Sequence, residues 1–331
     1  MTKSILVTGG AGYIGSHVIR QLTEQGEKVV VLDNLSTGFE NAVLGAEFVK
    51  GNMGDMELVS EVLKAHDVDT VMHFAAHTVV PESVENPLKY YSNNTANTRN
   101  LLECCQNHGI KHFVFSSTAA VYGMPEDHNV TEATPTSPIN PYGMSKLMSE
   151  HMLRDLGQAC DMRHVILRYF NVAGSDPEGR IGQRTPKATL LTKVAVEAAT
   201  GQRPHVYIFG TDYDTPDGTG VRDYIHVEDL ASAHIKALEY LRKGGESTTL
   251  NAGYGHGYSV REVLDMVGEV NGEPLKIIEE DRRAGDPPSL IAKASKIKEV
   301  LGWEPQFDDL KTIVSSALNW ERKLLKIRNE Q

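Results

Sequence analysis

Cysteine is scarce in this chain, and the few cysteines form no recognisable pattern. Only three occur among 331 residues: Cys104, Cys105 and Cys160. An odd number without zinc-ligand spacing predicts neither a disulfide framework nor a metal site. Because a reducing compartment is the simplest setting for such a chain, we expect a cytoplasmic protein. Cys104 and Cys105 are expected to fill the core side of a helix.

Long apolar runs and dense basic clusters are also absent. No apolar stretch approaches transmembrane length, and the run before Gly9 is too short for a signal peptide. The net charge is −11, from 44 acidic and 33 basic residues. This charge disfavours binding to nucleic acid or to an anionic membrane, because both repel an acidic surface. One phosphorylated small molecule remains compatible with it, since a few well-placed arginines are enough.

The composition that remains is that of a globular enzyme, with 40% hydrophobic and 23% charged residues. It allows one large domain or two unequal ones. Apolar runs that predict strands are Ser4–Thr8, Lys28–Leu32, Ala46–Val49, Thr70–Phe74, His112–Phe115 and His164–Arg168. Segments with helical spacing are Gly15–Gln25, Met56–Ala65, Leu88–His108 and Tyr142–Leu156. This alternation predicts an α/β fold with a parallel, doubly wound sheet of Rossmann type.

The regular alternation stops after Asn171. Asp176–Arg184 and Thr211–Gly220 are rich in turn-forming or charged residues, which predicts loops. Helical spacing returns in Val260–Val270, Ile291–Leu301 and Leu310–Ile327. We therefore predict a first domain over residues 1–171, to which a segment near 222–250 returns. Residues 172–331 are predicted to form a smaller, mixed α+β lobe.

Three glycines spaced three apart, Gly9, Gly12 and Gly15, separate the first predicted strand from the first predicted helix. Glycine lets the backbone approach a pyrophosphate, and the helix N-terminus offers free N–H groups and positive potential. A tight packing turn is the alternative interpretation, but three glycines carry a conformational cost that a turn alone does not require. Asp33 ends the second strand, where a carboxylate binds the adenosine ribose and repels a 2′-phosphate. We therefore predict NAD as the cofactor and the first domain as its binding domain.

Tyr142 and Lys146 form the pair with the most chemical content. Residues four apart share one face of a helix. An ammonium group beside a phenol favours the phenolate, so we expect a lowered pKa for Tyr142 and a role as general base on a sugar or alcohol hydroxyl. Tyr-x-x-x-Lys alone is usually a solvated helix face, but its occurrence together with the glycine turn supports the catalytic interpretation. Thr118 is expected at the same sheet edge, where it donates to the substrate oxygen.

Several segments together resemble the extended short-chain dehydrogenases/reductases. They are GGAGYIG, LDNLSTG, HFAA, SSTAAVYG, PYGMSK, RYFNVAG and DGTGVRDYIHVEDL. Within that family the chain is similar to the UDP-glucose (UDP-galactose) 4-epimerases from Ile5 to about Trp320. The RYFN and GTGVRDYIHV segments are typical of sugar-nucleotide epimerases, whereas the glycine and Tyr-x-x-x-Lys signals are shared more widely.

The resemblance implies a redox-neutral inversion at C4 of a UDP-sugar. Tyr142 would take the proton of the 4-hydroxyl while the C4 hydride passes to tightly held NAD. A transient 4-keto sugar would then turn over before the hydride returns to its other face. The resemblance also implies a small-molecule UDP-sugar as the partner, and a homodimer that pairs the Leu88–His108 and Tyr142–Leu156 helices.

Individual site residues are also implied by the resemblance. The catalytic residues are Tyr142, Lys146 and Thr118, and no metal ligand is implied. The cofactor-binding residues are Gly9, Gly12, Tyr13, Ile14, Gly15, Asp33, Asn34, Thr37, Gly38, Asn52, Met53, Phe74, Ala75, Ala76, Thr78, Asn93, Thr118, Tyr142, Lys146 and Phe170. The substrate-binding residues are Thr118, Tyr142, Asn171, Leu191, Tyr207, Phe209, Arg222, Arg283, Asp286 and Leu290. Among these, Arg222 and Arg283 are assigned to the diphosphate and Asp286 to the uridine ribose.

Four positions bear on departures from the family and on specificity. Asn52 stands where the family usually has Asp near the adenine, Thr78 where some members carry Lys, and Leu190 where some have a polar residue. Leu290 is intermediate between the tyrosine that goes with plain hexoses and the small residue that goes with N-acetylated sugars. UDP-N-acetylglucosamine and UDP-xylose/UDP-arabinose 4-epimerisation therefore remain open.

Three other classes of function are disfavoured by particular residues. A dehydratase of the superfamily would carry an Asp-Glu pair where this chain has Ala119-Ala120. A decarboxylase or glucuronate epimerase is disfavoured by RYFNVAG, which favours the neutral hexose branch. A non-catalytic NAD-binding regulator is the alternative outside enzymes. Such proteins tend to lose the tyrosine or the lysine, and both are present here.

Overall fold

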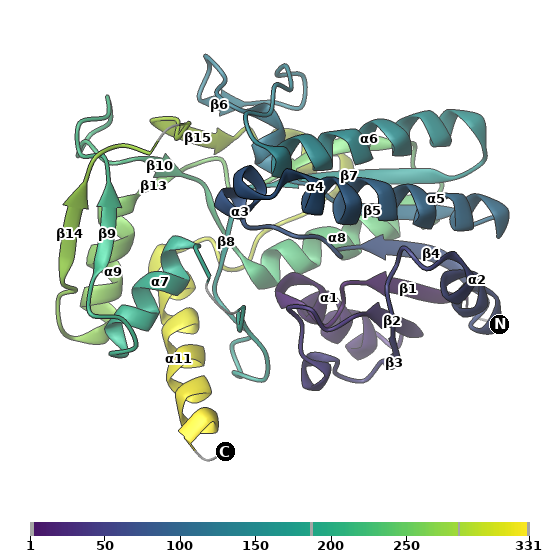
Figure 1. The fold of residues 1–331 in the computed structure, drawn as a ribbon, viewed down its shortest axis with the longest axis horizontal. Coiled ribbons are helices and arrows are strands. Elements are labelled where there is room, and N and C mark those ends of the chain that lie inside the picture. Colours follow the sequence, from purple (N-terminus) through teal and green to yellow (C-terminus); the bar gives the residue numbers. More distant parts are fainter. Residues whose placement is uncertain (1–2, 186–187, 284, 330–331) are drawn as a thin grey trace.

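A parallel sheet of seven strands forms the centre of the computed structural model, which describes residues 3–185, 188–283 and 285–329 (Figure 1). In spatial order the strands are β12 (Thr248–Ala252), β7 (Arg163–Tyr169), β5 (His112–Ser116), β4 (Val68–His73), β1 (Ser4–Thr8), β2 (Val29–Asp33) and β3 (Glu47–Lys50). All neighbouring pairs are parallel. The chain runs outward from β1 to β3 and then returns to β4 on the other side of β1. Ligands bind in the crevice that such a reversal opens at the carboxyl edge.

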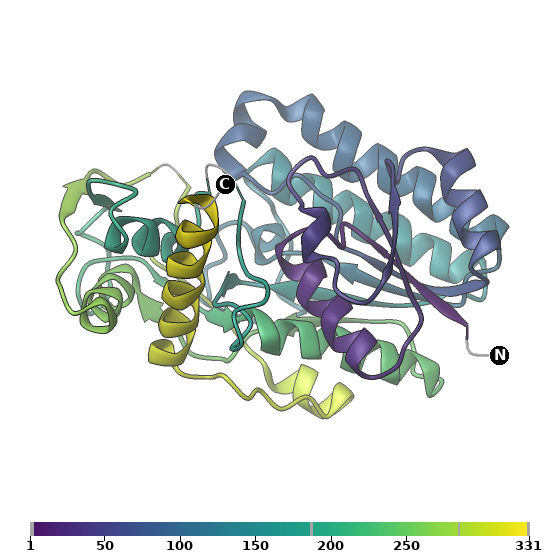
Figure 2. The same cartoon turned by 90° about the horizontal axis from the view of Figure 1, so that it is seen from below.

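Both faces of this sheet are buried, and successive residues of one strand face opposite cores. Ile5 and Val7 belong to one apolar cluster, and Leu6 between them belongs to the other. The first cluster includes residues of α1 (Tyr13–Glu24) and α8 (Val227–Arg242), and the second includes residues of α2 (Met56–Ala65), α5 (Asn97–Asn107) and α6 (Pro141–Ala159) (Figures 1 and 2). Burial on both sides explains why these strands read as continuous apolar runs.

A second group of elements lies beside this sheet (Figure 1). Its strands are β6 (Asn129–Val130), β8 (Asn171–Ala173), β9 (Val206–Phe209), β10 (Val221–Arg222), β11 (Tyr224–His226), β13 (Tyr258–Ser259), β14 (Ile277–Glu280) and β15 (Ser289–Ala292). They pair in the orders β13-β10-β15-β6, β11-β8 and β14-β9. The helices α7 (Leu191–Ala199), α9 (Val260–Asn271) and α11 (Leu310–Asn329) pack against one another. α10 (Ser295–Leu301) packs near α8 and β12.

Short helices connect the remaining parts of the chain. They are η1 (Glu40–Ala42), α3 (Val80–Glu85), α4 (Pro87–Tyr90), the π-helix η2 (Tyr91–Ala96) and η3 (Ala119–Tyr122). Within residues 3–185, 188–283 and 285–329, no helix has the length and apolarity needed to cross a membrane. Cys104 and Cys105 are buried in α5, as predicted, and all three cysteines are free thiols.

The predicted fold class is confirmed, including the parallel sheet and all six predicted strands. The seventh strand, β12, comes from the second half of the chain and pairs with β7. The strand completes the sheet from a part of the sequence that shows no regular βα pattern. The division of the chain near residue 171 stays a prediction.

Two predicted helices are corrected by the structure. The segment Leu88–His108 is not one regular helix, because α4 passes through the π-helix η2 before α5 begins at Asn97. Ile291–Leu301 was expected to be helical throughout, but Ser289–Ala292 is strand β15, and α10 begins only at Ser295. β15 pairs with both β10 and β6, and this pairing between distant segments overrides the local helical spacing.

Candidate active site

The glycine turn between β1 and α1 brings two backbones into close contact. Gly9 has a φ of 74°, and a Cβ there would lie 2.4 Å from the backbone nitrogen of Ala75. A Cβ at Gly15 would lie 2.5 Å from the carbonyl oxygen of Gly9. Neither position accepts a larger residue without movement of the backbone. The turn is therefore built for close approach, which is what a bound pyrophosphate requires.

The N-terminus of α1 is open to an anion. Gly12 is its N-cap residue, so no side chain caps the helix, and its first turn contains no acidic residue. The first N–H groups of a helix have no partner within the helix, and they carry positive potential. By contrast, α2 and α6 are capped by the side chains of Asp55 and Asn140. The residues present at α1 thus fit the phosphates of a dinucleotide.

Asp33 lies beside this turn at the end of β2. Its Oδ2 accepts a hydrogen bond from the Ala11 N–H at 3.0 Å, and its Oδ1 accepts one from the Leu35 N–H at 2.8 Å. Burial raises the pKa of this carboxyl, and the two N–H groups oppose that effect. The loop after β2 also packs on the turn, because a Cβ at Gly38 would lie 2.7 Å from the carbonyl carbon of Ala11. The predicted contact of Asp33 with an adenosine ribose fits this position.

At the predicted adenine end of the site, the Asn52 side chain is already hydrogen-bonded within the chain. Asn52 Oδ1 accepts hydrogen bonds from the Gly54 N–H at 2.8 Å and from Asn97 Nδ2 at 3.3 Å. A carbonyl oxygen has two lone pairs, so both are engaged within the chain. The predicted contact with an exocyclic amine would require Asn52 to release one of these partners. Met53, next to it, is buried.

Other predicted cofactor residues lie on the segments that follow β1, β2 and β4 at the carboxyl edge of the sheet. Ile14 is in the first turn of α1, Thr37 is on the exposed loop after β2, and Thr78 is on the loop after β4. Asn34 Oδ1 accepts from the Ser36 N–H at 2.9 Å, which shapes the loop after β2. Phe74 donates its N–H to the Thr8 carbonyl at 2.9 Å. That bond holds the start of the loop containing Ala75 and Ala76 against β1.

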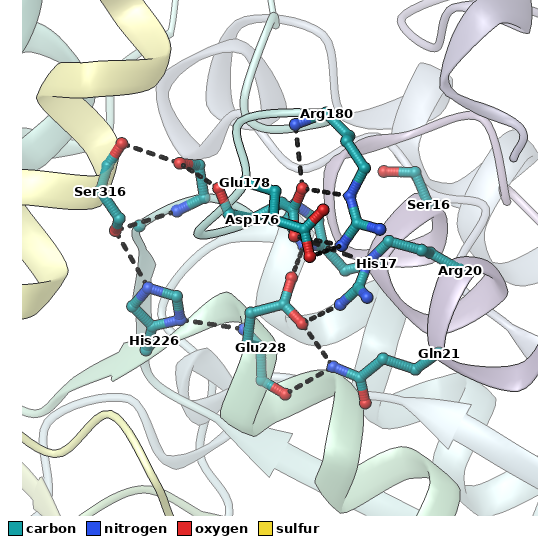
Figure 3. Close-up of polar contacts among 12 residues, drawn as sticks. Ser16, His17, Arg20, Gln21, Asp176, Glu178, Arg180, His226, Glu228 and Ser316 are labelled. Atoms are coloured by element: carbon teal, nitrogen blue, oxygen red, sulfur yellow. Dashed lines mark hydrogen bonds and ion pairs between the residues drawn. The ribbon is translucent and has the colours of Figure 1, made fainter. Parts of the chain in front are cut away.

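The position of α1 is further fixed by a polar cluster, which we call the α1 anchor: the buried residues His17, Arg20, Asp176 and Glu228, and the exposed Arg180 (Figure 3). His17 Nδ1 lies 2.5 Å from Glu228 Oε1, and Arg20 also binds the Glu228 carboxylate. Burial raises the pKa of Glu228, but His17 and Arg20 outweigh burial and leave that pKa below its usual value. Arg180 pairs with Asp176, whose pKa is lowered to about 2 despite burial.

A second contact joins α1 to the chain beyond β8. The Tyr13 hydroxyl donates to the Gly174 carbonyl at 2.6 Å. Together with the α1 anchor, this bond ties one helix to α8 and to the loop after β8. The orientation of the open helix N-terminus is therefore set by residues from both halves of the sequence.

Asn94 is a functional candidate that the sequence reasoning missed. It lies in the π-helix η2 and is 2% exposed. Its Oδ1 accepts from the His77 N–H at 2.8 Å, and its Nδ2 donates to the His77 carbonyl at 2.9 Å and to Ser145 Oγ at 3.1 Å. Asn93, a predicted cofactor residue, donates to the same Oδ1 at 3.0 Å. One side chain thus connects the loop after β4 to α6, and a rare π-helix places it there.

Tyr142, Lys146 and Thr118 converge at the carboxyl end of β5, as predicted. Tyr142 is 7% exposed, Lys146 2% and Thr118 8%. The Lys146 Nζ donates to the Ser116 carbonyl at 2.8 Å, and the Thr118 side chain forms a hydrogen bond with Tyr142. α6 starts directly before Tyr142, where Asn140 caps the N–H of Gly143 at 2.9 Å and Pro141 occupies the first turn.

The predicted direction of the Tyr142 pKa is wrong for the chain by itself. Burial raises the pKa of Tyr142 above its usual value, and the hydrogen bond with Thr118 opposes this only in part. Lys146 is directed to the Ser116 carbonyl, and burial lowers its own pKa to about 7 although Glu150 raises it. Desolvation thus decides the direction for both groups. A reactive phenol here needs one more positive charge, which an oxidised nicotinamide carries.

Glu150 extends the contact between α6 and β5 by one more turn. It is fully buried and accepts from Ser117 Oγ at 2.6 Å and from Arg168 Nε and Nη2 at 3.0 and 2.6 Å. Three successive turns of α6 are thereby joined to the three residues after Phe115, although not in chain order. Tyr142 is joined to Thr118, Lys146 to Ser116, and Glu150 to Ser117. The spacing of four residues from Lys146 to Glu150 was a readable signal that the sequence reasoning did not use.

On the substrate side, three predicted residues come from two separate pairs of short strands. Arg222 of β10 stands opposite Leu290 of β15, and Asn171 of β8 stands opposite Tyr224 of β11. Leu290 and the predicted cofactor residue Phe170 pack on an apolar cluster made of Ala119, Val121, Tyr122, Val130 and Leu147. Ala119 of this cluster follows Thr118 in the chain and Leu147 follows Lys146, so Leu290 packs against residues that flank the proton-transfer residues.

The predicted nucleotide end of the substrate site is more open. The rings of Tyr207 and Phe209 on β9 are 5.7 Å apart, and the Arg283 guanidinium lies 3.5 Å from the centre of the Phe209 ring. Tyr207 is 40% exposed. Leu191 begins α7, and the Asp286 N–H donates to the Arg283 carbonyl at 3.4 Å. These aromatic and cationic groups suit a base and a diphosphate.

Tyr213 was not predicted, and its surroundings make it a candidate. Its hydroxyl is buried and has no hydrogen-bond partner within the described part of the chain. Burial raises its pKa, Asp286 raises it further, and Arg222 and Arg282 lower it. Tyr213 therefore lies among residues assigned to the diphosphate and ribose. The sequence signal was weak, because a single tyrosine in a turn-rich acidic loop has no periodic context.

Comparison with known proteins agrees with this geometry. The model of the NAD dependent epimerase/dehydratase family matches residues 5–253. A UDP-glucose 4-epimerase of Azospirillum brasilense is 59% identical over 97% of this chain and 92% of its own length. The structure of UDP-glucose 4-epimerase from Brucella ovis in complex with NAD is 43% identical with a TM-score of 0.94, covering 96% of this chain and 98% of that one.

A further solved structure is relevant to substrate range. The UDP-Glc/GlcNAc 4-epimerase from Campylobacter jejuni is 50% identical with a TM-score of 0.86, and the alignment covers 97% of this chain and 99% of that chain. The family match spans more than half of the chain, and the relatives are aligned over nearly its whole length. This protein belongs to the NAD-dependent epimerase/dehydratase family.

Proposed function

We propose that this protein is an NAD-dependent isomerase that interconverts UDP-glucose and UDP-galactose by inverting C4 of the sugar. The observation that carries the proposal is the buried group of Tyr142, Lys146 and Thr118 at the sheet edge that also carries the uncapped N-terminus of α1. The similarity to UDP-glucose 4-epimerases over nearly the whole chain supports the same reaction.

Each residue has a chemical role in this proposal. Bound NAD supplies a hydride acceptor that returns the hydride to the same carbon. Tyr142 accepts the proton of the 4-hydroxyl and gives it back, while Thr118 donates a hydrogen bond to the same oxygen. Lys146 holds the nicotinamide ribose. Arg222 and Arg283 bind the diphosphate, because guanidinium groups form paired hydrogen bonds with phosphate oxygens.

Binding energy from the UDP part serves the reaction. Anchoring through the diphosphate and the base keeps the sugar within the site while leaving its ring free to turn. The aromatic pair Tyr207 and Phe209 provides apolar surface for the uridine. Tyr142 is buried, which excludes bulk water from the position where the 4-keto sugar must persist.

The test is a direct assay of the purified protein with separate UDP-sugars. UDP-galactose, UDP-N-acetylgalactosamine and UDP-arabinose are incubated singly, and the products are resolved by chromatography. We expect UDP-glucose to form from UDP-galactose, and far less of it to form with the Tyr142→Phe variant. If no UDP-sugar is converted by the wild-type protein, the proposed reaction is wrong and a non-catalytic NAD-binding role becomes the better interpretation.

A second activity, on UDP-N-acetylglucosamine, is compatible with Leu290. Its side chain is intermediate in size and packs on the apolar cluster beside Thr118, where the substituents of the sugar are expected. The similarity to a UDP-Glc/GlcNAc 4-epimerase supports this breadth. The same assay decides it through the products formed from UDP-N-acetylgalactosamine, and the UDP-arabinose sample tests pentose substrates.

The finer proposals concern assembly and location. An exposed apolar surface on α3, α4 and α6 supports a homodimer, because Val84 is 63% exposed, Leu88 75% and Met148 41%. Apolar surface of this kind is characteristic of subunit interfaces. A monomeric mass in solution, independent of concentration, would contradict this assembly. Three free thiols agree with a reducing cytoplasm.

A further inference from the structure

Asp223 follows Arg222 in the chain and has no exposed surface. Its carboxylate accepts three hydrogen bonds, all from backbone N–H groups. The Tyr254 N–H donates to Oδ1 at 3.0 Å, the Gly255 N–H to Oδ2 at 3.0 Å, and the Ala292 N–H to Oδ2 at 3.3 Å. A buried carboxylate is costly unless its oxygens are satisfied, and charge-assisted bonds of this kind are strong. Asp223 therefore fixes two separate segments, the turn after β12 and the end of β15.

The backbone of Asp223 connects two further segments. Its N–H donates to the Leu290 carbonyl at 3.3 Å, and its carbonyl accepts from the Asn171 N–H at 3.0 Å. Arg222 stands opposite Leu290 in the β10–β15 register. Three residues assigned to the substrate are therefore direct neighbours of the fully buried Asp223. Asn171 of β8 and Leu290 of β15 are hydrogen-bonded to its backbone, and Arg222 of β10 precedes it in the chain.

We propose that Asp223 is a positioning residue for the UDP-sugar, which sets the relative placement of Asn171, Arg222 and Leu290 and thereby substrate affinity and sugar choice. The inference rests on the proposed function, because these three residues contact the substrate only in that reaction. Asp223 acts through its neighbours. All three of its carboxylate bonds are made to backbone N–H groups, so a change of this side chain displaces the end of β15 and the turn after β12 relative to β10 and alters no charge exposed to the ligand.

Asp229 provides a matched comparison within the same chain. It is also buried, at 1% exposed, and accepts from the Gln306 and Phe307 N–H groups, both at 2.8 Å. It also accepts from the Tyr254 hydroxyl at 2.6 Å. Asp223 and Asp229 therefore bind opposite ends of Tyr254. Only Asp223 contacts β15 and, through its backbone carbonyl, Asn171 at the start of β8, whereas Asp229 holds the chain before α11.

The experiment compares Asp223→Asn with Asp229→Asn in the NAD-containing protein. Each variant replaces one carboxylate oxygen with an amide group that cannot accept an N–H bond. The measurements are UDP affinity by calorimetry, kcat and KM for UDP-galactose, the kcat/KM ratio of UDP-galactose to UDP-N-acetylgalactosamine, and the unfolding temperature. We expect Asp223→Asn to raise the UDP dissociation constant and KM by about tenfold, the effect of one lost charge-assisted bond. The substrate ratio should also shift, while kcat changes less.

Asp229→Asn should lower the unfolding temperature comparably and leave the UDP affinity and the substrate ratio within about twofold of wild type, well under the tenfold step of one lost bond. Equal UDP affinity and equal substrate ratios in the two variants would overturn the inference. Wild-type protein that binds UDP but converts no UDP-sugar would refute the proposed function while the affinity comparison still tests Asp223. Wild-type protein that binds no UDP would overturn both.

Gly253→Ala keeps the inference testable if Asp223→Asn does not fold. A Cβ at Gly253 would lie 2.6 Å from Asp223 Oδ2, so the alanine displaces the carboxylate without removing it. The expected change in KM and in substrate ratio has the same direction as for Asp223→Asn and is smaller. A folded Gly253→Ala variant with wild-type affinity and wild-type substrate ratio would count against the inference.

Discussion

The two sides of the crevice are built in different ways. Tyr142, Lys146 and Thr118 come from the end of β5 and the helix that follows it, and each is less than a tenth exposed. The other residues assigned to the substrate come from α7, β8, β9, β10, β15 and the loop after β14. Tyr207, among them, is 40% exposed.

This difference corresponds to two tasks. Proton transfer needs groups held in fixed geometry within a dry environment, and hydrogen bonds at successive turns of α6 provide that. Binding a nucleotide-sugar requires a surface that the ligand can reach and leave in each cycle, and short strands joined by loops provide such a surface. Changes on the proton-transfer side should therefore reduce kcat or stability, and changes on the substrate side should alter KM and selectivity.

The largest effect is expected for Tyr142→Phe. Loss of the phenolic hydroxyl removes the general base, so kcat should fall by about 10²–10⁴-fold. UDP affinity should be unchanged, because the substrate side remains intact. Steady-state kinetics together with calorimetric titration of UDP measure both quantities. Full activity in this variant would refute the role of Tyr142. A loss of UDP affinity would show that the proton-transfer residues and the substrate-binding residues do not act separately.

Glu150→Gln should destabilise the protein strongly, because it leaves the buried Arg168 guanidinium without its partner. Breaking a buried pair from one side costs roughly 3–5 kcal/mol of unfolding free energy. The matched control is Glu279→Gln on β14, which breaks the exposed pair with Arg261 of α9 and should cost less than about 1 kcal/mol. Urea unfolding of both variants tests the contrast. Equal losses would show that the two sides do not differ in rigidity.

Lys146→Met should raise the thermal stability of the nucleotide-free protein near pH 6 by several degrees while abolishing activity. Burial lowers the pKa of Lys146 from 10.5 to about 7, so folding disfavours its charged form. That penalty is complete below pH 7 and disappears as the pH rises towards 10.5. The stabilisation should therefore be smaller at pH 9 than at pH 6. Calorimetric scans at both pH values measure it, and a destabilised variant at pH 6 would contradict the expectation.

The smallest effect is expected for Leu290→Ala on the substrate side. A smaller side chain beside Thr118 should shift the kcat/KM ratio towards UDP-N-acetylated sugars by about tenfold, which is typical for altered apolar contacts in a pocket. UDP affinity should remain as in wild type. Competition between the two substrates in one reaction measures the ratio directly. An unchanged ratio would mean that other residues set the sugar choice.

Periodic features of the sequence predicted the fold well, and features that depend on distant contacts were missed. The strands of the large sheet are buried on both faces, so each leaves a continuous apolar run such as Ser4–Thr8. β15 leaves no such signal, because its four residues are stabilised by β10 and β6. The π-helix η2 is likewise invisible in an apolar pattern, since it shifts the register of a helix without ending it.

The candidate site shows the same division. Tyr142, Lys146 and Thr118 lie together because strand order and helix spacing place them there, and both can be read from the sequence. The direction of the Tyr142 pKa could not be read, because it depends on how deeply the phenol is buried. Asp223 escaped notice for a similar reason. Its three partners belong to segments about 30 and 70 residues away in the sequence.

The pairing of β12 with β7 has a consequence for synthesis of the chain. β7 ends at Tyr169, and its outer neighbour β12 is complete only at Ala252, about 80 residues later. At roughly 5–20 residues per second, a ribosome would need about 4–16 s to supply it. During that time β7 is an open edge that attracts other strands. A fragment ending near residue 171 would keep β7 unpaired on this side permanently, so the smallest piece that contains all seven strands extends to Ala252.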